Sequence, residues 1–192
     1  MNKEDLWKGP PLTEEERDEH YAKMTKIYDE RGHNYYSPTT ITIPYVRKHA
    51  CGNSVLDLGC GDGRVLRAVD DLFDVKVGVD MSKVRLDYAI AHTPNAKFYH
   101  RELTEFLKEC DDKFDTIMMF EVLEHLVNDL EIFDLASRIC NHIIVATVPL
   151  NMPGDTHYRA FRKIDEVKKR FNADQFELNK NGKFVLMNRK IK

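Results

Sequence analysis

Short apolar runs alternate with amphipathic stretches over most of this sequence. Runs that are apolar throughout, rather than at every second position, are typical of strands covered on both faces of a parallel sheet. Strands are predicted at residues 54–58, 75–80, 96–100, 114–120 and 142–148. Helices are predicted between and after them, at residues 63–73, 82–92, 103–110, 128–138 and 163–171. This order predicts an α/β domain in which helices cover both faces of the sheet.

The pattern changes near the end of the chain. Two segments of alternating character flank Asn181-Gly182, which is the strongest short signal for a hairpin, because both central positions of the tight turn need a positive φ. We therefore predict one α/β domain over residues 51–192. Its fold class is a single, doubly wound, seven-stranded, mostly parallel sheet that ends in an antiparallel C-terminal hairpin.

Residues 1–50 precede this pattern and are interpreted as an N-terminal helical extension. Thr13 and Glu16 have the spacing of a capping box, which opens a helix. One interpretation of the extension is a helix packed on the side of the sheet. The other is a lid whose aromatic residues contact a bound substrate, for which the adjacent Tyr35 and Tyr36 are the candidates.

Composition and charge narrow the class of protein. The 192 residues are 42% hydrophobic and 32% charged, which suits one globular domain with its own core. The formal charge of −3 gives no sign of a basic nucleic-acid surface. We see neither an apolar run of membrane-spanning length nor a secretory signal. The four cysteines lack metal-ligand spacing, so we expect reduced thiols and a cytoplasmic protein.

A glycine-rich turn follows the first predicted strand. Gly59, Gly61 and Gly63 leave the backbone bare there, so a ligand can approach it closely. The third glycine comes one residue too early for the dinucleotide fingerprint. Asp57 lies in the preceding strand, and Asp80 ends the second strand, where a carboxylate can accept hydrogen bonds from both hydroxyls of a ribose.

The stretch VLDLGCGDG resembles the first signature of the class I S-adenosylmethionine-dependent methyltransferases. The segments VGVDMS, FYHREL, FDTIMMFEVLEHL and IIVATVP follow in the order and spacing of that family. The resemblance covers residues 54–192, includes the terminal hairpin, and is similar to the subgroup that methylates small molecules. It implies a Rossmann-like methyltransferase fold, with S-adenosylmethionine as cofactor and S-adenosylhomocysteine as product.

The resemblance also implies a role for individual residues. Asp57 and the backbone of Gly59 and Gly61 would receive the ammonium and carboxylate of the methionine part. Asp80 would bind the ribose. The adenine would be met by the side chains or backbone of Met81, Glu102 and Leu103. The family usually has aspartate at the position of Glu102.

The residues after the fourth predicted strand are candidates for catalysis. If the methyl acceptor is a hydroxyl, its proton must leave, and a neutral imidazole is the natural general base near pH 7. We therefore expect His125 to act there, with Glu121 and His157 beside it. The alternative for His125 is a structural hydrogen bond to the neighbouring loop.

The loop over residues 149–161 would hold the acceptor, because loops at the ligand edge of a sheet usually carry such contacts. Tyr158 and Arg159 are its candidates, and the guanidinium of Arg159 suits a carboxylate or phosphate. Alternatively, this segment caps the helix that follows.

We predict metal-independent methyl transfer to an oxygen or nitrogen of a small molecule, with no membrane or nucleic-acid partner. A second hypothesis starts from Glu121, Glu124, His125 and His157, which resemble the metal set of small-RNA terminal 2′-O-methyltransferases. The acidic net charge argues against RNA. A third hypothesis is a cofactor-binding subunit that supports a partner without turnover.

Overall fold

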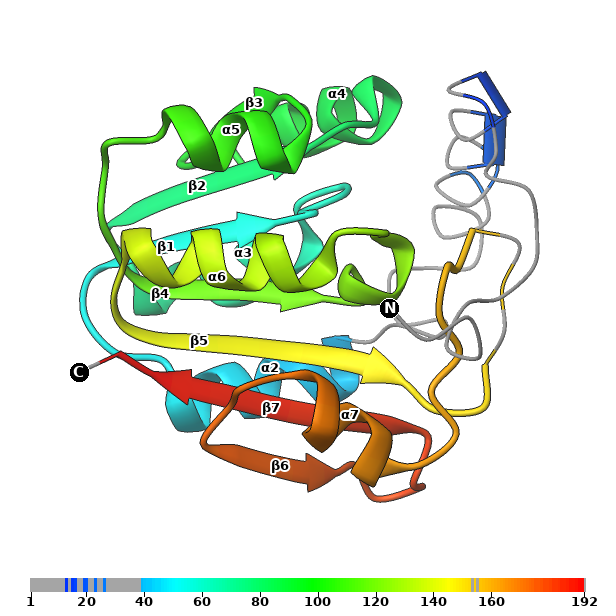
Figure 1. The fold of residues 1–192 in the computed structure, drawn as a ribbon. Helices are drawn as coiled ribbons and strands as arrows, with labels where there is room; N and C mark the ends of the chain where they lie inside the picture. Colours follow the sequence, from blue (N-terminus) through cyan, green and yellow to red (C-terminus); the bar gives the residue numbers. More distant parts are fainter. Residues whose placement is uncertain are drawn as a thin grey trace.

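Helices and strands alternate along the computed structural model, which describes residues 13, 15–16, 19–20, 23, 26, 39–152, 154 and 156–191 (Figure 1). The elements in chain order are α2 (Thr39–His49), β1 (Ser54–Leu58), α3 (Arg64–Ala68), η2 (Asp70–Leu72), β2 (Val75–Asp80), α4 (Lys83–His92), β3 (Lys97–His100), α5 (Leu103–Glu109), β4 (Phe114–Phe120), η3 (Leu123–His125), α6 (Asp129–Ile139), β5 (Cys140–Pro149), α7 (Ile164–Arg170), β6 (Gln175–Leu178) and β7 (Phe184–Lys190). The helix predicted at residues 63–73 is interrupted and forms two short helices, α3 and η2.

The strands form one seven-stranded sheet in the order β3-β2-β1-β4-β5-β7-β6. Neighbouring strands from β3 to β5 pair in parallel, whereas β7 pairs antiparallel with both β5 and β6. The predicted fold class is therefore confirmed. The chain order reverses between β1 and β4, and ligands of open α/β sheets bind beyond the carboxyl ends of the strands at such a point.

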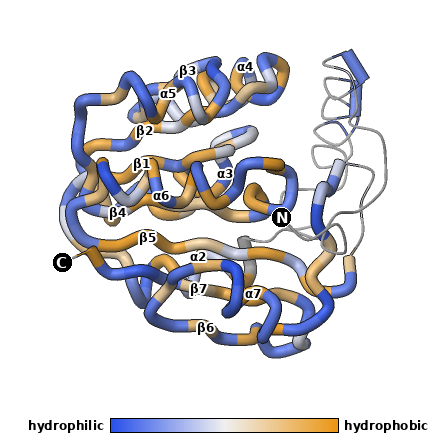
Figure 2. The backbone as a smooth tube through the Cα atoms, in the orientation of Figure 1, coloured by the Kyte–Doolittle hydropathy of each residue, from blue (hydrophilic) through white to orange (hydrophobic). Residues whose placement is uncertain are grey.

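The two faces of the sheet bury separate cores. Leu56 and Leu58 of β1 belong to the core beneath α5, α6 and α7, whereas Val55 belongs to the core beneath α2 and α3. Alternate residues of a strand point to opposite faces, which explains why a strand buried on both sides is apolar throughout. Figure 2 shows this as hydrophobic central strands with hydrophilic turns at their ends.

The terminal hairpin has a longer turn than the sequence predicts. Strand β6 ends at Leu178 and strand β7 begins at Phe184, so residues 179–183 connect them. Gly182 has a left-handed φ of 69°, but Asn181 is not among the left-handed residues of the described chain. The side-chain oxygen of Asn179 instead accepts hydrogen bonds from the amides of Lys183 (2.8 Å) and Phe184 (3.0 Å). An asparagine outside the predicted dipeptide therefore stabilises the connection.

Part of the predicted extension packs against the sheet. Tyr45 and Val46 of α2 are buried in the core beneath that helix. Thr13 and Glu16 exchange the two hydrogen bonds of a capping box, at 2.7 Å and 3.2 Å. The lid interpretation and the division at residue 50 stay predictions, because most residues before 39 lie outside the described part. No helix of the described residues has the length and apolar character needed to cross a membrane.

Asp115 fastens the start of β4 to its surroundings. Its carboxylate accepts hydrogen bonds from the side chain of Asn141 (3.0 Å) and from the amides of Asn53 (2.8 Å) and Ser54 (3.2 Å). These bonds, led by that from Asn141, lower the pKa of Asp115 to about 2. The ionised carboxylate therefore stabilises the fold.

Asp115→Asn should lower the free energy of unfolding by about 2 kcal/mol near pH 7, the scale expected for a carboxylate whose pKa falls by about two units on folding. A lowered pKa contributes stability above the unfolded-state value of about 4, and this stability is lost as the pH falls through the folded-state value. Urea unfolding between pH 7 and pH 2 should show the difference shrinking below about pH 4. The exposed Asp111→Asn is the control, and a pH-independent difference for Asp115→Asn would contradict the assignment.

Candidate active site

The turn after β1 is a tight corner built from glycines in the left-handed region. Gly59, Gly61 and Gly63 have φ values of 75°, 55° and 71°, which other residues adopt only with strain. A Cβ on Gly59 would lie 2.4 Å from Val122, and one on Gly61 would lie 2.6 Å from the guanidinium of Arg85. We call residues 59–63 the glycine corner.

Neighbouring backbone and side-chain oxygens hold the corner in place. The amides of Gly59 and Cys60 donate to the Val79 carbonyl, at 2.8 Å and 3.1 Å. The amide of Gly61 donates to the Asp80 carboxylate at 2.8 Å. The corner amides predicted to receive a carboxylate are therefore already engaged, whereas the carbonyls of the corner can still accept.

Two carboxylates border the corner. Asp57 is buried, and its Oδ2 has no hydrogen-bond partner within the described residues. Burial raises the pKa of Asp57, and the charges of Asp80 and Asp62 raise it further. Asp80 ends β2 and accepts from the amides of Gly61 and Ser82, each at 2.8 Å. A ligand that brings a cation to Asp57 would supply what this corner lacks.

The residues predicted to meet adenine lie along the ends of β2 and β3. Met81 follows Asp80 and is exposed, and Leu103 is buried at the start of α5. Glu102 caps α5, because its carboxylate accepts from the amides of Thr104 (2.7 Å) and Glu105 (3.1 Å). The carboxylate is thus used by the helix, and contact with adenine stays a prediction.

Glu121 follows β4 with a strained backbone. Its φ of 57° is left-handed, which is uncommon for a residue with a side chain and is typical of functional sites. Its carboxylate accepts a hydrogen bond from the hydroxyl of Thr147 at 2.8 Å. Burial raises the pKa of Glu121 to about 7, although the bond from Thr147 opposes this.

Glu124, His125 and His157 form a compact cluster, with candidate ligand atoms within 4.8 Å of one another. Glu124 is fully buried, and neither carboxylate oxygen has a hydrogen-bond partner in the described chain. The Nε2 of His125 lies 3.7 Å from Glu124 Oε1, and the two imidazole rings meet edge to face at 4.5 Å. One carboxylate and two imidazoles are a donor set suited to a divalent transition metal.

The protonation of His125 follows from its surroundings. Its Nδ1 lies 3.0 Å from the Thr156 carbonyl, which can only accept, so Nδ1 carries the proton and Nε2 presents its lone pair to the cluster. Burial lowers the pKa of His125 to about 3, and the charges of His157, Arg85 and His20 act in the same direction. The imidazole is neutral at pH 7, as expected, but it is a weaker base than an exposed histidine.

The loop that carries His157 is clamped to the segment after β4. The amides of Tyr158 and Arg159 donate to the Glu124 carbonyl, at 2.8 Å and 3.2 Å. The guanidinium of Arg159 is buried, donates to the carbonyls of Leu126 and Val127, and lies 3.2 Å from Asp129. This geometry does not support the predicted contact of Arg159 with an anionic acceptor, because the side chain holds the loop.

The remaining candidates differ in placement. Tyr158 is partly buried in the clamped loop, whereas Tyr35 and Tyr36 lie outside the described residues.

Sequence reasoning missed Arg85, whose guanidinium reaches the glycine corner from α4. Nothing in the local sequence signals this contact, because it depends on how α4 packs beside β1.

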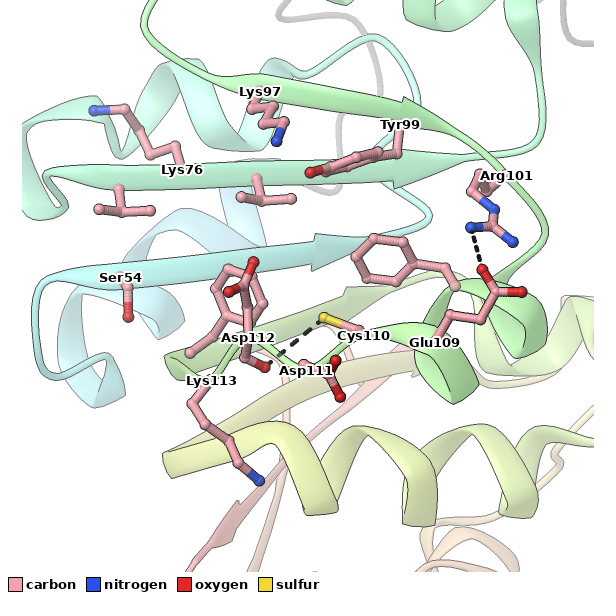
Figure 3. Close-up of a pocket in the computed structure, with 14 residues that line it drawn as sticks. Ser54, Lys76, Lys97, Tyr99, Arg101, Glu109, Cys110, Asp111, Asp112 and Lys113 are labelled. Atoms are coloured by element: carbon pink, nitrogen blue, oxygen red, sulfur yellow. Dashed lines mark hydrogen bonds and ion pairs between the residues drawn. The ribbon is translucent and has the colours of Figure 1, made fainter.

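A cavity of about 620 Å³ lies beside β1, β2 and β3 and the segment after α5 (Figure 3). It is lined by residues at the amino ends of strands, among them Ser54, Lys97 and Phe114. Charged groups of its lining pair with one another, as Arg101 does with Glu109 at 2.8 Å. The chemistry described above lies at the carboxyl ends instead.

Comparison with known proteins agrees with this geometry. The family model described as "Methyltransferase domain" matches residues 55–143, which include the glycine corner, Asp80 and His125. Residues 55–143, a little under half of the chain, thus resemble the class I S-adenosylmethionine-dependent methyltransferases, and the sheet has the fold of that family. The match ends before the loop that carries His157.

Curated relatives of this chain are named for different small molecules. The chain is 26% identical over 137 residues to the ubiquinone biosynthesis O-methyltransferase of Brucella melitensis biotype 2, covering 60% of this chain and 54% of that protein. It is 26% identical over 129 residues to the dTDP-3-amino-3,6-dideoxy-alpha-D-glucopyranose N,N-dimethyltransferase of Streptomyces fradiae, covering 64% and 50%. The chain thus spans about half the length of the curated relatives it matches.

A solved structure shares the fold. The S-adenosylmethionine-dependent methyltransferase from Clostridium acetobutylicum ATCC 824 aligns with a TM-score of 0.68 and 14% identity, covering 90% of this chain and 99% of that one. At this identity the likeness concerns the fold alone.

Asp129→Ala tests the clamp on the loop. Asp129 is fully buried, pairs with Arg159, and accepts two hydrogen bonds from Arg170, at 2.6 Å and 2.7 Å. Removing it leaves two largely buried cations without their carboxylate, so the free energy of unfolding in urea should fall by about 3–5 kcal/mol. Asp134→Ala on the same helix removes an exposed carboxylate 3.4 Å from Arg189 and should cost at most about 1 kcal/mol. Equal losses for the two variants would contradict the clamp.

Proposed function

We propose that this methyltransferase moves the methyl group of S-adenosylmethionine to an oxygen or nitrogen of a small-molecule acceptor. The observation that carries the proposal is that the glycine corner and the cluster of Glu124, His125 and His157 lie together, where the chain order of the strands reverses between β1 and β4. Val122, which packs against Gly59, joins the glycine corner to the segment that carries Glu121 and His125. A cofactor at the corner and an acceptor at the cluster would therefore be neighbours.

The residues at the corner fit the cofactor. The buried Asp57 oxygen without a partner suits the ammonium of the methionine part, and the carbonyls of Gly59 and Gly61 can add further acceptors. One oxygen of Asp80 accepts from the corner and the other from Ser82, and both can still accept bonds from ribose hydroxyls, since each carboxylate oxygen has two lone pairs. When bound, the sulfonium supplies a methyl group that is already activated.

Positioning then dominates the expected catalysis. Holding two reactants in line is worth roughly 7–11 kcal/mol, whereas a general base contributes about 10²–10⁴-fold in rate. We propose that the Nε2 lone pair of His125 accepts a hydrogen bond from the acceptor and takes its proton, with Glu121 and His157 bordering the same space. The weak basicity of His125 makes orientation its larger contribution.

Two further features support a small acceptor and a cytoplasmic location. One named relative is an O-methyltransferase of ubiquinone biosynthesis, and the other is an N,N-dimethyltransferase of a dTDP-linked amino sugar. These names support a small acceptor here. All four cysteines are free, which supports a reducing, cytoplasmic setting. We include both in the proposal.

Asp80→Ala and His125→Ala separate cofactor binding from methyl transfer. Asp80→Ala should weaken S-adenosylhomocysteine binding by about 1.5–3 kcal/mol for each charge-assisted hydrogen bond lost, as measured by calorimetry. His125→Ala should leave that affinity unchanged and lower turnover in an acceptor screen scored by S-adenosylhomocysteine release. Asp87→Ala, an exposed carboxylate on α4, is the control.

Two outcomes would contradict the proposal. If both variants matched the wild type in both assays, the site would lie elsewhere. If cofactor bound normally but no acceptor pool gave turnover, the hypothesis of a cofactor-binding subunit would be favoured.

The cluster of Glu124, His125 and His157 favours a second candidate, metal-dependent methyl transfer. Glu124 is the specific observation, because a fully buried carboxylate without hydrogen-bond partners in the described chain is costly unless a cation or proton satisfies it. Nδ1 of His125 is fixed by the Thr156 carbonyl, as the outer nitrogen of a metal ligand commonly is. A divalent cation held here would acidify an acceptor hydroxyl, such as the ribose 2′-hydroxyl that the RNA hypothesis requires.

Mn²⁺ binding tests this candidate without an acceptor. Glu124→Gln keeps the shape of the side chain and removes its charge, so it should abolish Mn²⁺ binding. In electron paramagnetic resonance titrations wild-type protein should attenuate the signal of free Mn²⁺, and this variant should not. The exposed Glu105→Gln is the matched control. Turnover that survives chelator in a protein that binds no Mn²⁺ would eliminate the metal and leave the first proposal intact.

A further inference from the structure

The cavity beside β1, β2 and β3 exists because α5 is short (Figure 3). Helix α5 begins after the carboxyl end of β3 and has seven residues, so it rises about 10 Å. The six residues of β2 extend about 20 Å. The amino end of that strand is therefore left uncovered, and Val75 there is 53% exposed. The space has about 620 Å³, which is the size of a small-molecule site.

The floor of this cavity is apolar and aromatic. The buried side chains of Val77, Phe106 and Phe114 line it. Tyr99 lines it as well, and its ring lies 5.3 Å from that of Phe106, with the two planes tilted by 49°. Aromatic rings pack against one another in tilted and offset arrangements, so the ring of a ligand would be favoured on this floor.

Several charged groups around the cavity are engaged by the protein itself. Arg101 and Glu109 form an ion pair at 2.8 Å. The ammonium groups of Lys76 and Lys113 donate to backbone carbonyls elsewhere in the chain. A ligand that bound to one of these groups would first have to break a contact within the protein, so they are poor candidates for recognition.

Lys97 and Asp112 lie on opposite sides of the floor, and neither forms an ion pair with another of the described residues. Figure 3 shows the ammonium of Lys97 and the carboxylate of Asp112 reaching into the cavity from β3 and from the segment after α5. Lys97 Nζ lies 4.8 Å from the centre of the Tyr99 ring. Tyr99 raises the pKa of Lys97, and the charge of Asp112 acts in the same direction. One cation and one anion are thus held apart over an apolar surface.

We propose that this cavity binds a free amino acid with an aromatic side chain. Lys97 and the hydroxyl of Tyr99 would hold its carboxylate, Asp112 its ammonium, and the apolar floor its ring. A zwitterion fits because it satisfies both separated charges at once, whereas a simple acid or amine leaves one of them without a partner. The proposal goes beyond methyl transfer, since none of the residues that line this cavity belongs to the glycine corner or to the Glu124 cluster.

The test uses three fluorinated probes that differ only in their charged groups. They are para-fluorophenylalanine, the amine left when its carboxylate is removed, and the acid left when its ammonium is removed. Fluorine NMR titrations would measure the affinity of each probe for wild-type protein, Lys97→Met, Asp112→Asn and Lys83→Met. Lys83 is an exposed partner of Asp87 on α4, so Lys83→Met measures general electrostatics. Thermal unfolding checks that each variant is folded.

Wild-type protein should bind the amino acid about 3- to 10-fold more tightly than either single-charge probe, a modest factor because Lys97 and Asp112 are exposed to solvent. Lys97→Met should weaken binding of the amino acid and the acid but not of the amine. Asp112→Asn should weaken binding of the amino acid and the amine but not of the acid. Lys83→Met should change none of the three affinities. Direct contact with each charge is what gives this crossed pattern.

Three results would overturn the inference. One is that Lys97→Met and Asp112→Asn weaken all three probes equally, or weaken none. Another is that wild-type protein binds no probe. The third is displacement of the amino acid by saturating S-adenosylhomocysteine, which would put the probe in the proposed cofactor site. The proposed function stands in each case, because it is tested by cofactor affinity and turnover.

Discussion

The hydrogen bond from the Gly61 amide to the Asp80 carboxylate is the contact on which the cofactor half of the site depends. It ties the corner after β1 to the end of β2. The other oxygen of Asp80 accepts from the Ser82 amide, which starts α4 beside the corner. Because α4 carries Arg85, the Asp80 carboxylate holds the glycine corner and this guanidinium in a fixed relation. Four of the five corner amides, those of Gly59, Cys60, Gly61 and Gly63, donate to neighbouring oxygens in building this arrangement.

Backbone carbonyls assemble much of the proposed acceptor half of the site, together with the Asp129 carboxylate that pairs with Arg159. The Glu124 carbonyl receives two amides of the loop after β5, and the Thr156 carbonyl receives His125. Arg159 closes the arrangement by binding carbonyls on the segment after β4. Two stretches about thirty residues apart in the sequence are thereby held as one unit next to the corner. The parallel neighbours β1 and β4 bring both halves to the same edge.

Much of the fold could be predicted because its signals are local. The strands at residues 54–58, 75–80 and 114–120 have the predicted bounds, since each is an apolar run buried on both faces. The hairpin was predicted but not the length of its turn, because the side chain of Asn179, outside the predicted dipeptide, also accepts amides of the connection. Arg159 and Arg85 could not be assigned from the sequence, because their roles depend on partners 30 and 24 positions away, Asp129 and Gly61. The corner itself was predictable, since only glycines allow it.

Two buried carboxylates, one in each half of the site, share an energetic problem. Asp57 and Glu124 are both removed from water, and oxygens of both lack partners within the described chain. A fold optimised for stability alone would replace them with apolar groups, because an unsatisfied buried carboxylate costs free energy or forces protonation. They lie at the ends of adjacent strands, at the edge where ligands of such sheets bind. The free energy lost there in folding would be recovered when a cation or a hydrogen-bond donor arrives, so these two side chains would favour positively charged ligands in the proposed site.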